Sequence, residues 1–252
     1  MKRFACLFGG LVLVLAGTVR AESVSFSTDF SGTTLNSNLT AAGPAGTQQA
    51  LDGNGHLLLF TSPDNVARNS DTWGASIDSA RVTYGVDSTD TRDFTMETAV
   101  SSWIQSGESD RSQAGILLVF GTGTEMFGLN SASTIAAQGD IGGQSQFLSS
   151  SVSSSAINGD GINVGLKITR EGTTYTFSYR LGSSGTWTDV GTRTSSAELN
   201  SVGLFTKTYA GTNISNATFD SMSFTVVPEP SAVSMVVTGI IGLLAYAWRK
   251  RK

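Results

Sequence analysis

The residues that could carry acid–base or nucleophilic chemistry are few in this chain. His56 is the single histidine and Cys6 is the single cysteine. Sites built from several histidines are therefore excluded, and a serine–histidine triad would depend on His56 alone. His56 follows the turn-forming residues Gly53-Asn54-Gly55. This context predicts a histidine at a strand edge or on the surface.

A pair of carboxylates is the second kind of site that could do chemistry. Retaining glycosidases hold two carboxyl groups about 5 Å apart, and alternate residues of a strand share one face. Glu108 and Asp110 come nearest to this spacing, but Gly107 and the polar residues around them predict a loop. We therefore expect no catalytic residues and no enzymatic activity. The alternative is a secreted glycoside hydrolase or lyase, which would need two carboxylates facing a common groove.

Carbohydrate binding uses aromatic faces that stack on sugar rings, with amide and carboxylate groups around them. Trp103 ends an alternating strand and Trp187 follows a Gly-Ser-Ser-Gly turn, so packing roles are expected for both. Trp73 and Tyr209 lie beside small and polar residues. We expect these two side chains to be exposed and to be the ligand-binding residues.

The N-terminus has the layout of a secretory signal. Two basic residues precede a mostly apolar stretch from Phe4 to Gly17. The region before the expected cleavage site then ends in a small residue, Ala21. This stretch is shorter than the roughly 20 residues that span a bilayer. We therefore expect export by the Sec machinery and cleavage by signal peptidase after Ala21, with an uncleaved anchor as the alternative. Cys6 would leave with residues 1–21, so the mature protein would have no disulfide.

The C-terminus combines three features. Pro228-Glu229-Pro230 comes first, an uncharged stretch over residues 232–248 follows, and basic residues fill positions 249–252. The prolines hold their segment extended. The uncharged stretch predicts one transmembrane helix, whose basic tail would remain in the cytoplasm.

This order of tripeptide, hydrophobic stretch and basic cluster resembles the PEP-CTERM sorting signal of Gram-negative bacteria. The resemblance covers residues 227–252. It implies that exosortase, a membrane-embedded protease, cuts the chain near Pro228 after a stage at the inner membrane, and that the protein then reaches the cell surface or the extracellular matrix. A plain tail anchor is the alternative.

Removing both ends leaves about 207 residues, a length that suits one β-sandwich domain over residues 22–226. This body has nine basic and nineteen acidic residues. A net charge of about −10 argues against nucleic-acid binding.

Short runs of β-branched and aromatic residues, separated by Gly, Ser, Asn and Asp, predict antiparallel strands throughout the body. Residues 115–120 are apolar on both faces, which predicts a central strand. Phe219, Met222 and Phe224 share one face if a bulge follows Asp220. The predicted strands are Ser23 to Phe30, His56 to Thr61, Trp73 to Ser79, Phe94 to Trp103, Ala114 to Phe120, Met126 to Asn130, Phe147 to Val152, Asn163 to Arg170, Thr174 to Arg180, Thr186 to Thr192, Val202 to Thr206 and Ala217 to Val226.

The order of several segments resembles the concanavalin A-like, laminin G-like jelly roll. Residues 26–32 contain Phe and Asp and would form the strand that opens the domain. Residues 164–180 have the pattern of two strands, and residues 219–224 would form the strand that closes the domain. The resemblance implies an all-β, two-sheet antiparallel sandwich. Glucanases of this fold carry Glu-x-Asp-x-x-Glu on one strand, and that motif is absent here.

Proteins that resemble this one often bind a structural calcium ion beside the terminal strands. The resemblance implies Asp29 and Asp220 as its ligands, with backbone carbonyls nearby. The alternative is that both aspartates cap strand ends. From the sequence we expect an exported, non-enzymatic module that is adhesive or associated with extracellular polysaccharide. A purely structural matrix protein without a ligand is a further alternative.

Overall fold

The computed structural model describes residues 25–64, 66, 69–74, 76–106, 112–131, 133–141, 144–209, 213–227 and 232–250. The predicted signal peptide with its cleavage site at Ala21, the Pro228-Glu229-Pro230 motif and the pair Glu108 and Asp110 lie outside these residues.

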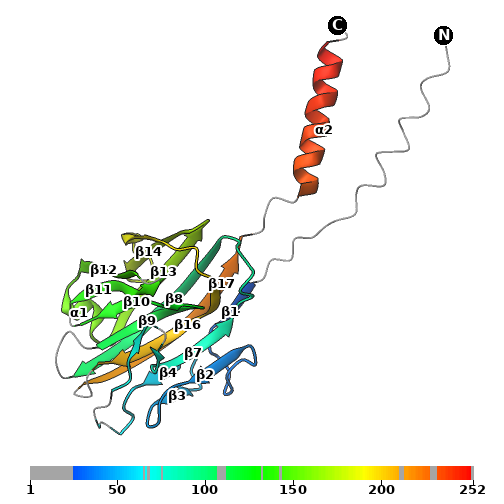
Figure 1. The fold of residues 1–252 in the computed structure, drawn as a ribbon. Helices are drawn as coiled ribbons and strands as arrows, with labels where there is room; N and C mark the ends of the chain where they lie inside the picture. The colour runs from blue at the N-terminus through cyan, green and yellow to red at the C-terminus, as the bar shows by residue number, and fades with distance from the viewer. Residues whose placement is uncertain are drawn as a thin grey trace, which may run out of the picture. The chain divides into compact units, whose positions relative to one another are not determined.

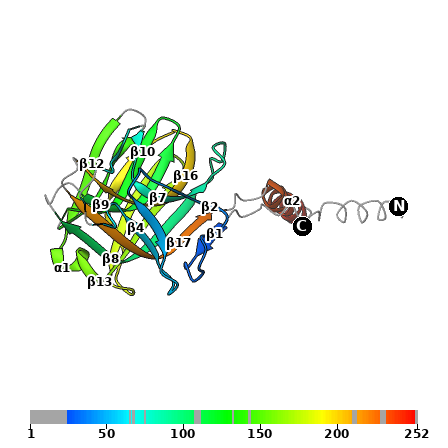
Figure 2. The ribbon, with the colours of Figure 1, turned by 90° about the horizontal axis from the view of Figure 1, so that it is seen from below.

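Two antiparallel sheets form the body of the protein and lie face to face (Figures 1 and 2). Seven strands of the larger sheet are ordered β15-β14-β13-β8-β17-β4-β3, and β1 also pairs with β17. The predicted all-β, two-sheet sandwich is confirmed. The strands of this sheet are β1 (Ser25–Thr28), β3 (Gln48–Leu51), β4 (Leu57–Phe60), β8 (Phe94–Ser106), β13 (Gly159–Glu171), β14 (Thr174–Leu181), β15 (Thr188–Thr194) and β17 (Ile214–Val226).

The second sheet has seven strands in the order β12-β11-β10-β9-β16-β7-β2. A separate two-stranded hairpin, β5 (Thr72–Trp73) with β6 (Ser76–Ile77), belongs to neither large sheet. The strands of the second sheet are β2 (Leu39–Ala42), β7 (Ala80–Gly85), β9 (Ser112–Phe120), β10 (Gly123–Asn130), β11 (Thr134–Ile141), β12 (Gln144–Ser151) and β16 (Leu199–Thr208).

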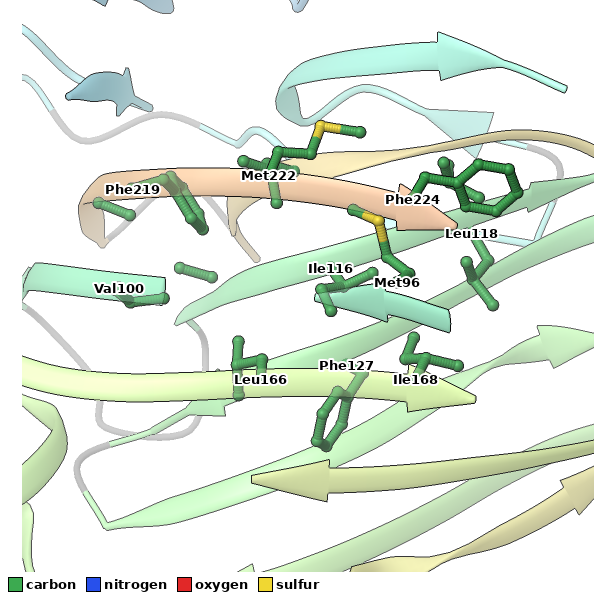
Figure 3. Packing of buried hydrophobic residues seen from close by; sticks show 14 of the residues in the cluster. Met96, Val100, Ile116, Leu118, Phe127, Leu166, Ile168, Phe219, Met222 and Phe224 are labelled. Carbon is green, nitrogen blue, oxygen red and sulfur yellow. The ribbon is translucent and has the colours of Figure 1, made fainter. Parts of the chain in front are cut away.

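The main core fills the space between the two sheets. Alternate residues of each strand point inward, so Leu166 and Ile168 on β13 share one buried cluster with Ile116 and Leu118 on β9 (Figure 3). The predicted buried face of β17, formed by Phe219, Met222 and Phe224, is confirmed. The pairing of β17 with β8 shifts register around Asp220, as the predicted bulge requires.

Strand β9 occupies the middle of the second sheet and is buried on both faces, as its sequence predicted. Its neighbour β10 approaches closely at Gly128. A Cβ atom on Gly128 would lie 2.0 Å from the carbonyl oxygen of Ala114. Glycine is therefore required where these two central strands meet.

Several strand predictions were wrong or incomplete. The segment Trp73 to Ser79 is not one strand, because its residues form the β5–β6 hairpin. Strands β2, β3, β7 and β11 were not predicted; β11 is rich in small residues, and β2 and β3 have only four residues each. A one-turn helix, α1 (Ser154–Ile157), was also not predicted.

Helix α2 (Ala232–Arg249) forms over the uncharged C-terminal stretch. A transmembrane helix was predicted there. Within the described residues, no helix is both long enough and apolar enough to cross a membrane.

Candidate functional site

A pocket of 410 Å³ lies on the face of the second sheet that points away from the main core. It contains both aromatic residues that the sequence analysis selected, Trp73 and Tyr209. These two residues are separated by more than half the chain, and the fold brings them to one site. Asp71, Trp73, Ser112, Asn130, Gln138, Lys207 and Tyr209 line this pocket.

The β5–β6 hairpin positions Trp73 over the sheet. Ile77 packs against a second, smaller cluster formed by Leu117, Met126 and Phe205 on the outward face. The base of the hairpin is closed by the hydrogen bond from the amide of Asp78 to the carbonyl oxygen of Asp71, at 2.9 Å. The packing of the partly buried Ile77 therefore holds the short hairpin against the sheet.

The segment that leads into the hairpin is joined to the end of β16. Ser70 and Thr208 exchange two backbone hydrogen bonds of 3.1 Å each. Tyr209 directly follows Thr208, so this bridge brings the chain at Tyr209 close to the chain that carries Trp73. Trp73 and Tyr209 are 42% and 55% exposed, so solvent reaches both residues.

An ion pair lies at one wall of the pocket. Lys207 Nζ is 3.0 Å from Asp71 Oδ1, and the amide of Thr72 donates to the same oxygen at 2.8 Å. Burial lowers the pKa of the Lys207 amine, whereas Asp71 acts in the opposite direction. The amine also lies 5.8 Å from the centre of the Trp73 ring. The pair fixes the position of the Asp71 carboxylate beside the indole.

Amide groups form another wall. The side chain of Gln113 is buried and donates to the carbonyl oxygen of Ala136 at 3.3 Å, and Gln138 Nε2 donates to Gln113 Oε1 at 2.6 Å. This chain orients the Gln138 amide. Its carbonyl oxygen has no hydrogen-bond partner among the described residues, nor has the side-chain amide of Asn130. Both can hydrogen-bond a ligand.

The remaining tryptophans differ in their surroundings. Trp103 is fully buried and its indole nitrogen donates to Ser215 Oγ at 2.9 Å, so the expected packing role is confirmed. Trp187 is half-buried on the larger sheet. Lys167 Nζ and Arg180 Cζ lie 4.1 Å and 4.8 Å from the centre of its rings.

His56 lies at the start of β4, at a partly exposed position. Its Nδ1 is 2.6 Å from Asp52 Oδ2, and its Nε2 is 3.7 Å from Asp220 Oδ1. The hydrogen bond with Asp52 raises the pKa of His56. Ser101 Oγ donates to Asp220 and not to His56. This arrangement is therefore not a serine–histidine triad.

The two aspartates proposed as calcium ligands each have local partners. Asp29 Oδ1 accepts from the amide of Ser31 at 3.1 Å, which is the alternative capping role at the end of a strand, since Asp29 directly follows β1. Asp220 accepts from Ser101 and faces His56. The part of the chain that the structure describes contains no group of three or more His, Cys, Asp or Glu side chains arranged to hold a metal ion.

The polar residues of the pocket were not predicted from the sequence. A usable signal was present, because residues two apart on an extended chain share a face. Asp71 stands two residues before Trp73, and Lys207 two residues before Tyr209. Asn130 and Gln138 had no such signal, since only the pairing of β10 with β11 brings their strands together.

No protein-family model matches the chain, and no curated protein matches it in sequence. Solved structures do share its fold. The GH43 protein BlXynB from Bacillus licheniformis has a TM-score of 0.60 at 14% identity, over 80% of this chain and 39% of that chain. The present chain thus spans about two fifths of the length of that protein.

Two other similar structures are matched over nearly their whole length. The CBM2 module of the evolved Dit protein of Lactobacillus casei BL23 phage J-1 has a TM-score of 0.56 at 12% identity, over 82% of this chain and 98% of that chain. Lectin I from Ulex europaeus, solved with the methyl glycoside of α-L-fucose, has a TM-score of 0.54 at 14% identity, over 81% and 97%. These likenesses establish a shared two-sheet fold.

Proposed function

We propose that this protein is a non-enzymatic carbohydrate-binding module, and that the pocket between Trp73 and Tyr209 is its binding site. The observation that carries the proposal is that two exposed aromatic rings from distant segments line one pocket together with amide and carboxylate groups. Aromatic faces stack on the apolar faces of sugar rings, and polar groups at the rim select hydroxyl positions.

The fold adds indirect support. A lectin and a carbohydrate-binding module are among the solved structures with this fold. Fold likeness does not define a function, so the proposal depends on the pocket itself.

The composition of the pocket favours binding over hydrolysis. Hydrolysis of a glycosidic bond requires two carboxyl groups, one on each side of the bond. Among the described residues that line this pocket, Asp71 is the one carboxylate, and Lys207 holds it in an ion pair. A carboxylate fixed in this way is suited to accept hydrogen bonds from sugar hydroxyls.

We also propose that the module acts outside the cell. The resemblance of residues 1–21 to a signal peptide and of residues 227–252 to a PEP-CTERM sorting signal supports export, cleavage after Ala21 and processing by exosortase near Pro228. Extracellular polysaccharide would then be the natural partner of an exposed sugar-binding pocket.

A glycan array probed with the full-length protein tests the binding proposal. We expect saturable binding to a defined glycan, and a loss of about fivefold or more in affinity for Trp73→Ala and for Tyr209→Ala, because stacking on an exposed ring contributes roughly 1 kcal/mol or more.

Phe147→Ala is the matched control for Tyr209→Ala. Phe147 is 56% exposed, close to the value for Tyr209, and it does not line the pocket. The control should bind as the wild type does. Absence of binding to every glycan on the array, or equal loss in all three variants, would refute the proposal.

A further inference from the structure

A second hollow adjoins the proposed binding pocket. It has a volume of 280 Å³ and shares two residues, Asp71 and Trp73, with the larger pocket. We call the larger one the aromatic pocket and the smaller one the hairpin pocket. The hairpin pocket is lined by Pro44, Asn69, Asp71, Trp73, Ser76 and Asp78.

The hairpin pocket is small when taken alone. Binding sites for small molecules usually enclose roughly 300–1,000 Å³, and the hairpin pocket at 280 Å³ lies below this range. The two meet at the indole of Trp73, which is 42% exposed and therefore accessible from solvent. A ligand that lies along this indole can enter both pockets at once, whereas a single sugar unit would fill only one.

The charges around the hairpin pocket restrict the ligand. Among the described residues, its lining holds two carboxylates, Asp71 and Asp78, and no cation. Two cations lie nearby. Lys207, which lines the aromatic pocket, is paired with Asp71. The guanidinium of Arg81 donates to the carbonyl oxygens of Ile77 and Ser79. Carboxylates accept hydrogen bonds from hydroxyl groups, but they repel other anions.

We propose that the hairpin pocket is a second subsite, and that the protein recognises a neutral oligosaccharide of at least two units that extends across Trp73. This inference rests on the proposed function of the aromatic pocket. Asp78 is then a specificity-determining residue. Its side chain is exposed and already oriented, since Ser76 Oγ donates to Asp78 Oδ2 at 2.9 Å.

The test measures how affinity depends on ligand length. Neutral gluco-, xylo-, manno- and galacto-oligosaccharides of one to six units are titrated into the full-length protein by calorimetry, with oligogalacturonides of the same lengths as anionic probes. We expect affinity in one neutral series to rise beyond the first unit and then level off. Asp78→Ala should weaken binding of the longer members about tenfold, as expected for a lost hydrogen bond to a charged group, and leave the shortest members unchanged.

Asp160→Ala is the matched control. Asp160 is an exposed aspartate that accepts a hydrogen bond from a serine, Ser102, at 2.7 Å, as Asp78 does from Ser76, and it lines neither pocket. Thermal unfolding of both variants checks that each is folded. The control should reproduce the wild-type dependence on length.

The outcomes separate this inference from the function on which it rests. If affinity does not depend on length, or Asp78→Ala has no effect on long ligands, while Trp73→Ala still abolishes binding, the second subsite is refuted and the aromatic pocket stands. Tighter binding of oligogalacturonides than of every neutral series would refute the neutral specificity. If no series binds, both proposals fall.

Discussion

Replacement of Glu125 by glutamine should remove a large part of the pH dependence of folding stability. Glu125 on β10 and Arg193 on β15 come from different sheets, and both side chains are almost completely buried between them. Arg193 Nη1 is 2.6 Å from Glu125 Oε2, and Arg193 Nη2 donates to the carbonyl oxygen of Ala137 at 3.2 Å. The second carboxyl oxygen, Oε1, has no partner among the described residues.

Burial raises the pKa of Glu125 to about 8, even though Arg193 favours the charged form. In the unfolded chain the carboxyl group titrates near its ordinary pKa of about 4.3. Between these two values the folded protein retains a proton that the unfolded chain has lost. Stability contributed by this proton is fully present below the unfolded pKa and is lost as the pH rises through the folded pKa.

The magnitude follows from the width of this window. Each pH unit inside it costs about 1.4 kcal/mol, so between about pH 5.5 and pH 7.5 the wild type should lose roughly 2–3 kcal/mol of unfolding free energy from this group. The glutamine side chain does not titrate, so the variant should lack this contribution. His56, whose pKa is also raised, contributes a loss in the same direction in both proteins.

Urea unfolding followed by tryptophan fluorescence at both pH values measures the difference. The quantity of interest is the change in stability with pH of the wild type minus that of Glu125→Gln, because contributions shared by both proteins cancel. Equal pH dependence in the two proteins would refute the argument that Glu125 remains protonated in the fold near neutral pH.

Two further predictions concern the core and the ends of the chain. Trp103→Phe should lower the unfolding free energy by about 1–3 kcal/mol, because it leaves the buried Ser215 hydroxyl without its indole donor and creates a small void; urea unfolding measures this, and an unchanged midpoint would contradict it. The intact mass of the protein recovered from the surface of producing cells should correspond to a chain that begins after Ala21 and ends near Pro228. The variant Pro228→Ala should retain the C-terminal segment. A wild-type mass that includes residues 232–250 would contradict the sorting proposal.

Local sequence patterns were sufficient for most of the architecture. Alternation of apolar and polar residues identified the long strands β13, β14 and β17, because each has one face toward the core and one toward solvent. The apolar run in β9 was read correctly as a central strand. The patterns failed where tertiary contacts replace local preference, as in the four-residue strands β2 and β3, whose place at the sheet edges depends on pairing with β7 and β4.

The hairpin that carries Trp73 shows why a local reading failed at the site. A continuous strand from Trp73 to Ser79 agreed with the residue types, but Gly74 has a positive φ of 57° and the chain turns there into β6. The turn lets Ile77 cover the outward cluster of Leu117, Met126 and Phe205. The residues near position 75 do not indicate that Ile77 packs on an apolar cluster formed by distant residues of the second sheet.

The sequence by itself determined the all-β class and, with one cysteine and one histidine, excluded a disulfide within the chain and any site built from several histidines. It also selected Trp73 and Tyr209 as candidates for ligand binding. These properties follow from composition and short-range periodicity. Only the tertiary structure decided that Trp73 and Tyr209 share a pocket, that Asp71 and Lys207 pair beside them, and that a second hollow adjoins the indole. The physical reason is that the first two relations join residues more than a hundred positions apart, and that strand pairing across the sheet, not local preference, sets their distances. The hairpin pocket likewise depends on the fold, which brings Pro44 to the β5–β6 hairpin.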